Sequence, residues 1–112
     1  MDRYPDEKIA ELLKSRLPDW SLEHVFLART YETGDWTRTT LLAGAIAYLG
    51  EKAFHHPDLF LSYPSLKVLL TTHDAGGITE RDVALAEKIE ELASWKPDFE
   101  VFKDAKPWFL RT

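Results

Sequence analysis

The side chains best suited to chemistry in this sequence are one carboxylate and three histidines. His55 and His56 are adjacent, Glu51 precedes His55 by four residues, and His73 follows later in the chain. The ordinary pKa of histidine lies near neutrality, so an imidazole can either donate or accept a proton. Glu51 and His55 at positions i and i+4 of one helix would share a face. The spacing therefore indicates a cleft for general acid–base catalysis.

Two other interpretations of these side chains remain open from spacing alone. Adjacent histidines at the end of a helix are often polar surface residues, and a histidine at the end of a strand often only hydrogen-bonds a loop. Glu51, either His55 or His56, and His73 could instead form a two-histidine, one-carboxylate site for Fe(II) or Zn(II). No close ligand spacing such as HExxH supports that metal site.

Composition narrows the class of protein. The chain has 112 residues, a net charge of -5 and no cysteine. This length is typical of one domain. The absence of cysteine excludes disulfides, thiolate metal sites and cysteine nucleophiles. The acidic balance argues against nucleic-acid binding, and no apolar run reaches the ~20 residues of a membrane span. The charged N-terminus has no signal-peptide core. We expect a soluble cytoplasmic domain.

The helices and strands that must position the histidines are predicted from the spacing of apolar residues and from the residues that end helices and strands. A first helix is expected after Tyr4 and before Pro18, and a second from Asp35 to about Phe54. Residues 20–31 fit one long strand or a hairpin, and residues 59–63 and 66–73 fit two strands. The last of these strands ends at His73 and can return beneath the histidine pair. A third helix follows a capping box at residues 79–82. Segregated helices and strands predict an α+β fold, with helices covering one face of an antiparallel sheet.

The second helix is apolar on most of its circumference. Its second stripe comprises Leu41, Leu42, Ala45, Tyr48 and Leu49. A helix of this kind must be buried on most sides. In so small a domain, the second stripe is expected to meet another copy of the chain.

The C-terminal segment, residues 94–112, holds five of the 14 aromatic residues of the chain. Disordered tails are usually poor in aromatic residues. We therefore predict a domain at residues 1–93 and an aromatic-rich extension at 94–112 that packs on the domain or on an interface.

These patterns together resemble the pterin-4a-carbinolamine dehydratases. The resemblance covers about residues 5–93. Its fixed points are Glu51, His55-His56-Pro57, Tyr63, Thr71-Thr72-His73, Gly77-Ile78-Thr79 and Asp82. It implies a four-stranded antiparallel sheet with three helices on one face, and a hairpin within residues 20–31. It also implies a homodimer or homotetramer formed through the helix around Leu41–Leu49 and a sheet edge.

The activity implied by the resemblance is loss of water from a 4a-hydroxytetrahydropterin to give a quinonoid dihydropterin, with no cofactor and no metal. The reaction recycles the pterin of aromatic amino-acid hydroxylases. His55, His56 and His73 match the catalytic histidines. The implied substrate-contacting positions are Glu51, Phe54, Pro57, Thr71 and Asp82.

The sequence also departs from the family pattern. Phe54 stands where the family usually has Asp or Asn, and Leu59 stands where an aromatic residue is common. Members of this fold also act as binding or assembly proteins, so fold alone does not decide function. A non-catalytic interaction protein is therefore the alternative to an enzyme.

Overall fold

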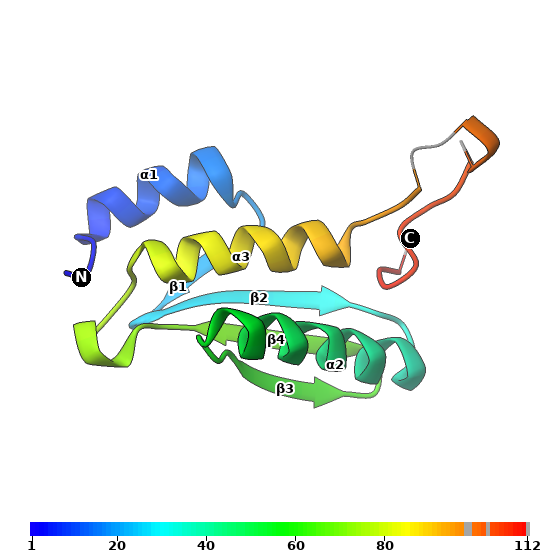
Figure 1. Ribbon diagram of the computed structural model, residues 1–112, viewed down its shortest axis with the longest axis horizontal. Coiled ribbons are helices and arrows are strands. Elements are labelled where there is room, and N and C mark those ends of the chain that lie inside the picture. Colours follow the sequence, from blue (N-terminus) through cyan, green and yellow to red (C-terminus); the bar gives the residue numbers. More distant parts are fainter. Residues whose placement is uncertain (98–99, 103, 112) are drawn as a thin grey trace.

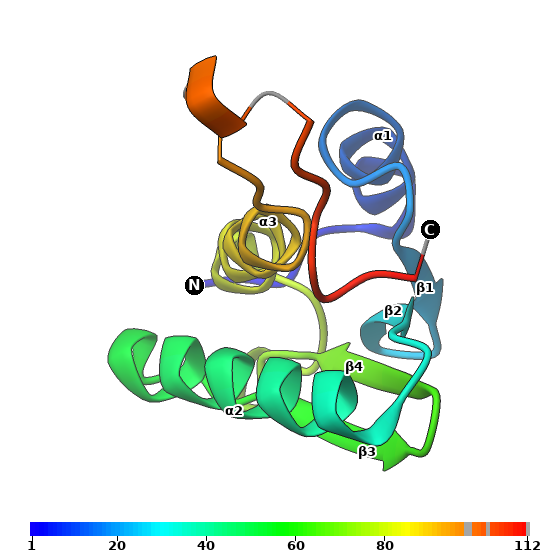
Figure 2. The same ribbon diagram turned by 90° about the vertical axis from the view of Figure 1, so that its right-hand side faces the viewer.

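The computed structural model describes residues 1–97, 100–102 and 104–111. A four-stranded antiparallel sheet has the strand order β1-β2-β4-β3. Three helices lie on one face of this sheet (Figures 1 and 2). The elements in chain order are α1 (Asp6–Arg16), β1 (Ser21–Glu23), β2 (Phe26–Glu32), α2 (Trp36–Ala53), β3 (Asp58–Ser62), β4 (Ser65–Leu70), η1 (His73–Ala75), α3 (Glu80–Ala93) and η2 (Glu100–Phe102). The α+β prediction is confirmed.

Residues 20–31 form a hairpin and not one long strand. β1 pairs with β2 in a register that places Glu23 opposite Phe26. His24, in the connecting turn, has a φ of 56°, a left-handed conformation that a continuous strand cannot contain. His24 therefore serves the turn.

The core lies between the helices and one face of the sheet. Along β4 the side chains alternate, so that Leu66, Val68 and Leu70 are buried while Lys67 is partly exposed. Leu27 and Tyr31 of β2 are fully buried on the same inner face, opposite Leu70 and Leu66. This period of two is the pattern expected for a sheet with one covered face.

β4 ends earlier than the sequence pattern suggested. It stops at Leu70, and His73 lies in the short 3₁₀ turn that follows. The Thr72 amide donates to the Gly77 carbonyl at 3.0 Å, which turns the chain out of the sheet. His73 is therefore carried by a turn and is exposed.

α2 buries one face made from both of the apolar stripes. Its buried residues are Thr39, Leu42, Ala43, Ile46 and Gly50. By contrast, the side chains of Leu41 and Tyr48 are exposed by 53% and 64%. The helix thus covers the sheet with one side, and no described part of the chain covers its apolar outer side.

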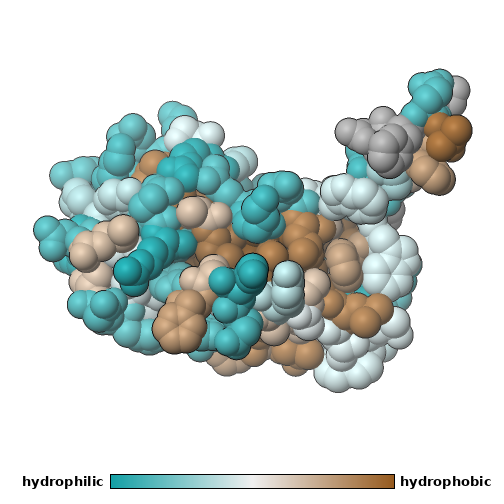
Figure 3. Space-filling view, viewed as in Figure 1, coloured by the Kyte–Doolittle hydropathy of each residue, from teal (hydrophilic) through white to brown (hydrophobic). Residues whose placement is uncertain are grey.

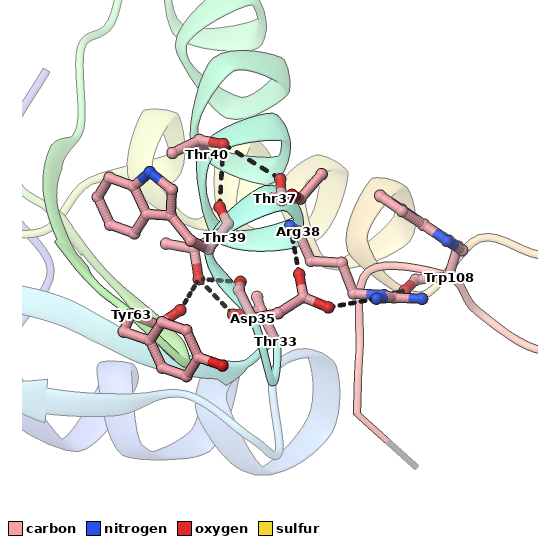
Figure 4. A network of polar contacts seen from close by, with 9 residues as sticks. Thr33, Asp35, Thr37, Arg38, Thr39, Thr40, Tyr63 and Trp108 are labelled. Carbon is pink, nitrogen blue, oxygen red and sulfur yellow. Dashed lines mark hydrogen bonds and ion pairs between the residues drawn. The ribbon is translucent and has the colours of Figure 1, made fainter.

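The described part of the C-terminal segment returns to the beginning of α2. The Trp108 carbonyl accepts a hydrogen bond from Arg38 Nε at 2.8 Å, and the Arg38 guanidinium lies 4.4 Å from the centre of the Trp108 ring. Figure 4 shows Arg38 between Asp35 and Trp108. The Arg111 amide also donates to the Glu32 carbonyl at 2.7 Å. The division into 1–93 and 94–112 stays a prediction.

Within the described ranges, no helix combines the length and the hydropathy needed to cross a membrane.

Candidate active site

The histidine pair lies at a sharp corner after α2. The helix ends at Ala53 because Phe54 adopts the left-handed conformation, with a φ of 51°. The amide of His55 still donates to the Gly50 carbonyl, at 3.0 Å. A Cβ atom on Gly50 would come within 2.7 Å of Pro57 Cδ. Glycine at this position therefore allows the segment 55–57 to fold back against the last turn of the helix.

His55 pairs with Asp82 and not with Glu51. His55 Nε2 lies 2.6 Å from Asp82 Oδ1, and the two side chains are 14% and 0% exposed. The expectation that Glu51 and His55 share a helical face is wrong, because the helix ends before His55. Glu51 instead lies beside His56, with 3.4 Å between Oε2 and Nε2, and both are exposed.

Asp82 is held by two further hydrogen bonds to its second oxygen. Oδ2 accepts hydrogen bonds from the Thr72 hydroxyl at 2.7 Å and from the Thr79 amide at 2.9 Å. The contact with Thr79 belongs to the capping box of α3, as the sequence predicted. The Thr72 and Thr79 hydroxyls also contact each other at 2.9 Å. A carboxylate accepts hydrogen bonds only, so His55 Nε2 carries the hydrogen and Nδ1 is left for proton exchange.

The capping box in the sequence explained Asp82 without His55. Only the packing of α3 against the corner after α2 reveals their contact, because they lie far apart in the chain. A buried carboxylate beside an imidazole orients the ring and selects its tautomer.

All three predicted catalytic histidines line one cavity of about 430 Å³. Three of the five predicted substrate-contacting residues also line this cavity. The full lining is Phe54, His55, His56, Pro57, Asp58, Thr71, Thr72, His73, Asp74 and Arg81. The other two predicted substrate-contacting residues, Glu51 and Asp82, do not line it but contact the lining residues His56 and His55. All eight predicted site residues therefore line this cavity or contact a residue that lines it.

Thr71 faces the cavity with its hydroxyl hydrogen already committed. Its Oγ1 donates to the Val25 carbonyl at 2.6 Å, and the residue is 7% exposed. The hydroxyl can therefore act toward a ligand only as an acceptor. The same bond ties the β1–β2 turn to the end of β4.

Arg81 is a cavity residue that sequence reasoning missed. It lies in the first turn of α3, beside the capping residue Asp82. Its side chain lines the histidine cavity and also a second, larger cavity of about 710 Å³. Its place next to the capping box was the only available signal.

The described residues contain no group of three or more His, Cys, Asp or Glu side chains placed to hold a metal ion. The geometry gives a reason for this. His55 is directed at Asp82, while Glu51 faces His56. The set that would use His55 is therefore not assembled, and the Glu51–His56 pair has no third such ligand among the described residues.

Comparison with known proteins links this geometry to a family. The family model described as "Pterin 4 alpha carbinolamine dehydratase" matches residues 2–92. A relative from Thermomicrobium roseum, provisionally named a pterin-4-alpha-carbinolamine dehydratase, is 46% identical over 84% of this chain and 100% of its own length. A relative from Aquifex aeolicus with the same provisional name is 42% identical, covering 78% of this chain and 87% of its own.

Solved structures show the same fold. The crystal structure of a transcriptional coactivator/pterin dehydratase from Brucella melitensis has a TM-score of 0.73 and 26% identity, covering 80% of this chain and 96% of its own. A pterin dehydratase-like protein, described as a RuBisCO assembly factor in the alpha-carboxysome, has a TM-score of 0.56 and 19% identity, covering 69% and 89%. The second likeness concerns the fold alone.

Proposed function

Because the chain belongs to the pterin 4 alpha carbinolamine dehydratase family, we propose that it removes water from a 4a-hydroxytetrahydropterin by histidine acid–base catalysis. The product is the quinonoid dihydropterin. The observation that carries this proposal is the pairing of His55 with the buried Asp82, at the edge of a cavity that His56 and His73 also line.

The reaction needs one proton delivered and one removed. An imidazolium protonates the 4a-hydroxyl as the carbon–oxygen bond breaks and water leaves. A neutral imidazole takes a proton from the ring nitrogen system, so electrons and charge balance without an oxidant. Each acid or base of this kind is typically worth about 10²–10⁴-fold in rate.

We assign the acid–base pair to His55 and His73, with His56 binding or assisting. His55 is oriented through Asp82, which leaves Nδ1 for the substrate. His73 is exposed in η1 and lines the cavity from that turn, whereas His55 follows α2. Glu51 acts through His56, and Phe54, Pro57 and Thr71 form walls that contact the substrate.

The test is a stopped-flow assay of 4a-hydroxytetrahydrobiopterin dehydration. We expect the protein to accelerate the reaction, and His55→Ala and His73→Ala each to lose about 10²–10⁴-fold in rate. His24→Asn is the matched control, because it removes an imidazole outside the cavity while keeping a residue that tolerates a positive φ. The proposal would be contradicted if the wild-type protein did not accelerate dehydration above the rate in buffer. Full activity in the double histidine variant would also contradict it.

We also propose that the protein forms a homodimer or homotetramer. The outward side of α2 presents the exposed side chains of Leu41 and Tyr48, with Ala45 half-buried between them, and β3 is an outer strand of the sheet. A cytoplasmic location and a role in recycling the pterin of aromatic amino-acid hydroxylases belong to the same proposal and rest on family membership.

The alternative is a non-catalytic interaction or assembly protein on the same fold. Two observations favour it: the uncovered side of α2, and the replacement of the usual Asp or Asn by Phe54, which is 83% exposed at the cavity. A biological role that survives the His55→Ala/His73→Ala double variant would support binding over catalysis.

A further inference from the structure

A second cavity adjoins the histidine cavity and is larger. Its volume is about 710 Å³, and it lies between the C-terminal half of α2 and the N-terminal half of α3. Phe54, His55 and Arg81 line both cavities, so the two adjoin at these side chains. The histidine cavity, at about 430 Å³, already falls within the size range of small-molecule sites. The second cavity is therefore additional space beside the reacting centre.

The floor of this second cavity is apolar. Leu49, Ala84 and Leu85 contribute to it, and Leu85 is only 6% exposed. Figure 3 shows hydrophobic side chains gathered between α2 and α3, with hydrophilic ones beside them. Such a surface fits a flat aromatic group better than a short hydroxylated chain.

The rim of the cavity is cationic. Its ten lining residues include Lys52, Arg81 and Lys88 and no carboxylate. This concentration of positive charge stands in a chain whose net charge is -5. Lys88 contacts Glu91 at 3.1 Å through an exposed pair, which leaves it able to bind a second anion. An anionic group at the end of a ligand matches this rim.

From these observations, and resting on the proposed dehydratase function, we infer that the α2–α3 cavity binds the substituent of the pterin substrate. The substrate class is a reduced pterin that carries an aryl group ending in carboxylates, as folates do. The pterin ring occupies the histidine cavity, the aryl group lies on the apolar floor, and the carboxylates face the three cations. Leu41 and Ala45 of the proposed contact with a second copy lie outside this lining, whereas Tyr48 lines the cavity, so the ligand would lie at the border of that contact.

Binding of stable dihydropterins tests this assignment by calorimetry. 7,8-Dihydrofolate carries the aryl group and the carboxylates, 7,8-dihydrobiopterin carries neither, and 7,8-dihydroneopterin phosphate carries charge alone. We expect dihydrofolate to bind about tenfold more tightly than dihydrobiopterin, with dihydroneopterin phosphate between them. Equal affinity for dihydrofolate and dihydrobiopterin would overturn the inference. Equal affinity for dihydrofolate and the phosphate would overturn the aryl part of it.

Variants locate the effect. Lys52→Ala and Lys88→Ala should each lower the ratio of dihydrofolate to dihydrobiopterin affinity by about threefold, the size of an exposed ion pair. Lys14→Ala, an exposed lysine on α1, is the matched control and should leave the ratio unchanged. An unchanged ratio in both cavity variants contradicts the inference.

The two proposals fail in different ways. If only the substituent site is wrong, the protein still dehydrates 4a-hydroxytetrahydrobiopterin and binds the pterins without preference. If the dehydratase function is wrong, that assay shows no acceleration whatever the preference among ligands, and the inference falls with it.

Discussion

The two carboxylate oxygens of Asp82 contact different parts of the molecule. Oδ2 closes the capping box of α3 and accepts the Thr72 hydroxyl, while Oδ1 faces His55 Nε2. One buried side chain therefore fixes the start of a helix and the orientation of an imidazole. Loss of either contact has a separate, measurable effect.

Asp82→Asn should separate orientation from stability. An amide NH₂ facing His55 Nε2–H cannot accept its hydrogen, so the ring loses its fixed tautomer. We expect kcat to fall by at least about tenfold, toward the roughly 10⁴-fold loss known for a misoriented catalytic histidine, with KM changed less than about twofold. Long-range ¹H–¹⁵N NMR of His55 should report a changed tautomer.

Thermal unfolding of the same samples is the control: the Asn oxygen can still accept from the Thr79 amide, so the free energy of unfolding should fall by less than the roughly 1 kcal/mol of a lost cap. An unaltered tautomer together with an unaltered kcat would show that Asp82 only caps the helix.

Phe54→Asn should stabilise the protein. A bulky residue at a φ of 51° is strained, and Asn adopts this conformation more readily. The Phe54 side chain is 83% exposed, so little packing is lost beyond its edge contact with the His56 ring. The free energy of unfolding should rise by about 0.5–1 kcal/mol, measured by urea denaturation.

Phe60→Asn, at an exposed position on β3 with ordinary strand conformation, is the control and should lower stability. A loss of stability in Phe54→Asn would mean that the aromatic ring contributes more than the backbone strain costs.

At the level of elements, local rules predicted what local interactions decide. The Asp35 cap, the capping box of α3 and the alternation along β4 all depend on neighbouring residues, and the structure contains each of them. The end of α2 could not be predicted to the residue, because it depends on the αL conformation of Phe54. The His55–Asp82 contact depends on tertiary packing between α2 and α3, which no spacing in the sequence encodes.

Gly50→Ala tests the corner after α2. The added Cβ would approach Pro57 Cδ to 2.7 Å and the His55 carbonyl to 3.2 Å. Either the helix end or the histidine segment must shift, so we expect a loss of about 1–3 kcal/mol in the free energy of unfolding and reduced dehydration activity.

Gly44→Ala is the matched control within the same helix. Apart from the neighbouring residues and the backbone of the helix itself, no described atom lies within 4 Å of its added Cβ, and the position is exposed. Helix propensity alone should raise stability by up to about 1 kcal/mol. Equal effects of the two substitutions in denaturation experiments would refute the proposed close contact at Gly50.

Glu90 links α3 to the sheet through a partly buried network. Its carboxylate accepts hydrogen bonds of 2.9–3.0 Å from Trp20 Nε1, Arg29 Nε and the Tyr31 hydroxyl. Burial raises the pKa of Glu90, but these hydrogen bonds outweigh it, so the pKa lies below its ordinary value. This network contributes stability above the unfolded pKa of about 4.3, and that stability is lost as the pH falls through the folded pKa.

Glu90→Gln should therefore lower the free energy of unfolding by about 1–3 kcal/mol at neutral pH. The difference from wild type should shrink as the pH falls below about 4.3, where the unfolded carboxyl takes up a proton, and should be lost once the pH is below the lowered folded pKa. Urea denaturation between pH 7 and pH 3 measures this. Glu11→Gln, an exposed carboxylate on α1, should change little; a pH-independent difference for Glu90→Gln would contradict the assignment.

At the scale of the whole molecule, the uncovered side of α2 bears on assembly. Leu41→Glu places a charge in the middle of this face, at a side chain that is 53% exposed in the single chain. If α2 packs against a second copy, the substitution should raise the Kd of the assembly by at least about tenfold. Sedimentation equilibrium measures this Kd. Thr37→Glu, also exposed but in the first turn of α2, is the comparison. A wild-type monomer at high concentration would disprove the predicted assembly.

The pairing of β2 with β4 also affects how the chain can fold during synthesis. These central strands place Leu27 opposite Leu70, so α2 and β3 must both be made before β2 finds its inner neighbour. Until then a nascent chain carries β2 with one edge unpaired, which is a surface that invites association between chains. Closing so distant a contact also slows folding relative to a helical bundle. Ribosome-bound fragments that stop after α2 are therefore the species most exposed to aggregation and most dependent on chaperones.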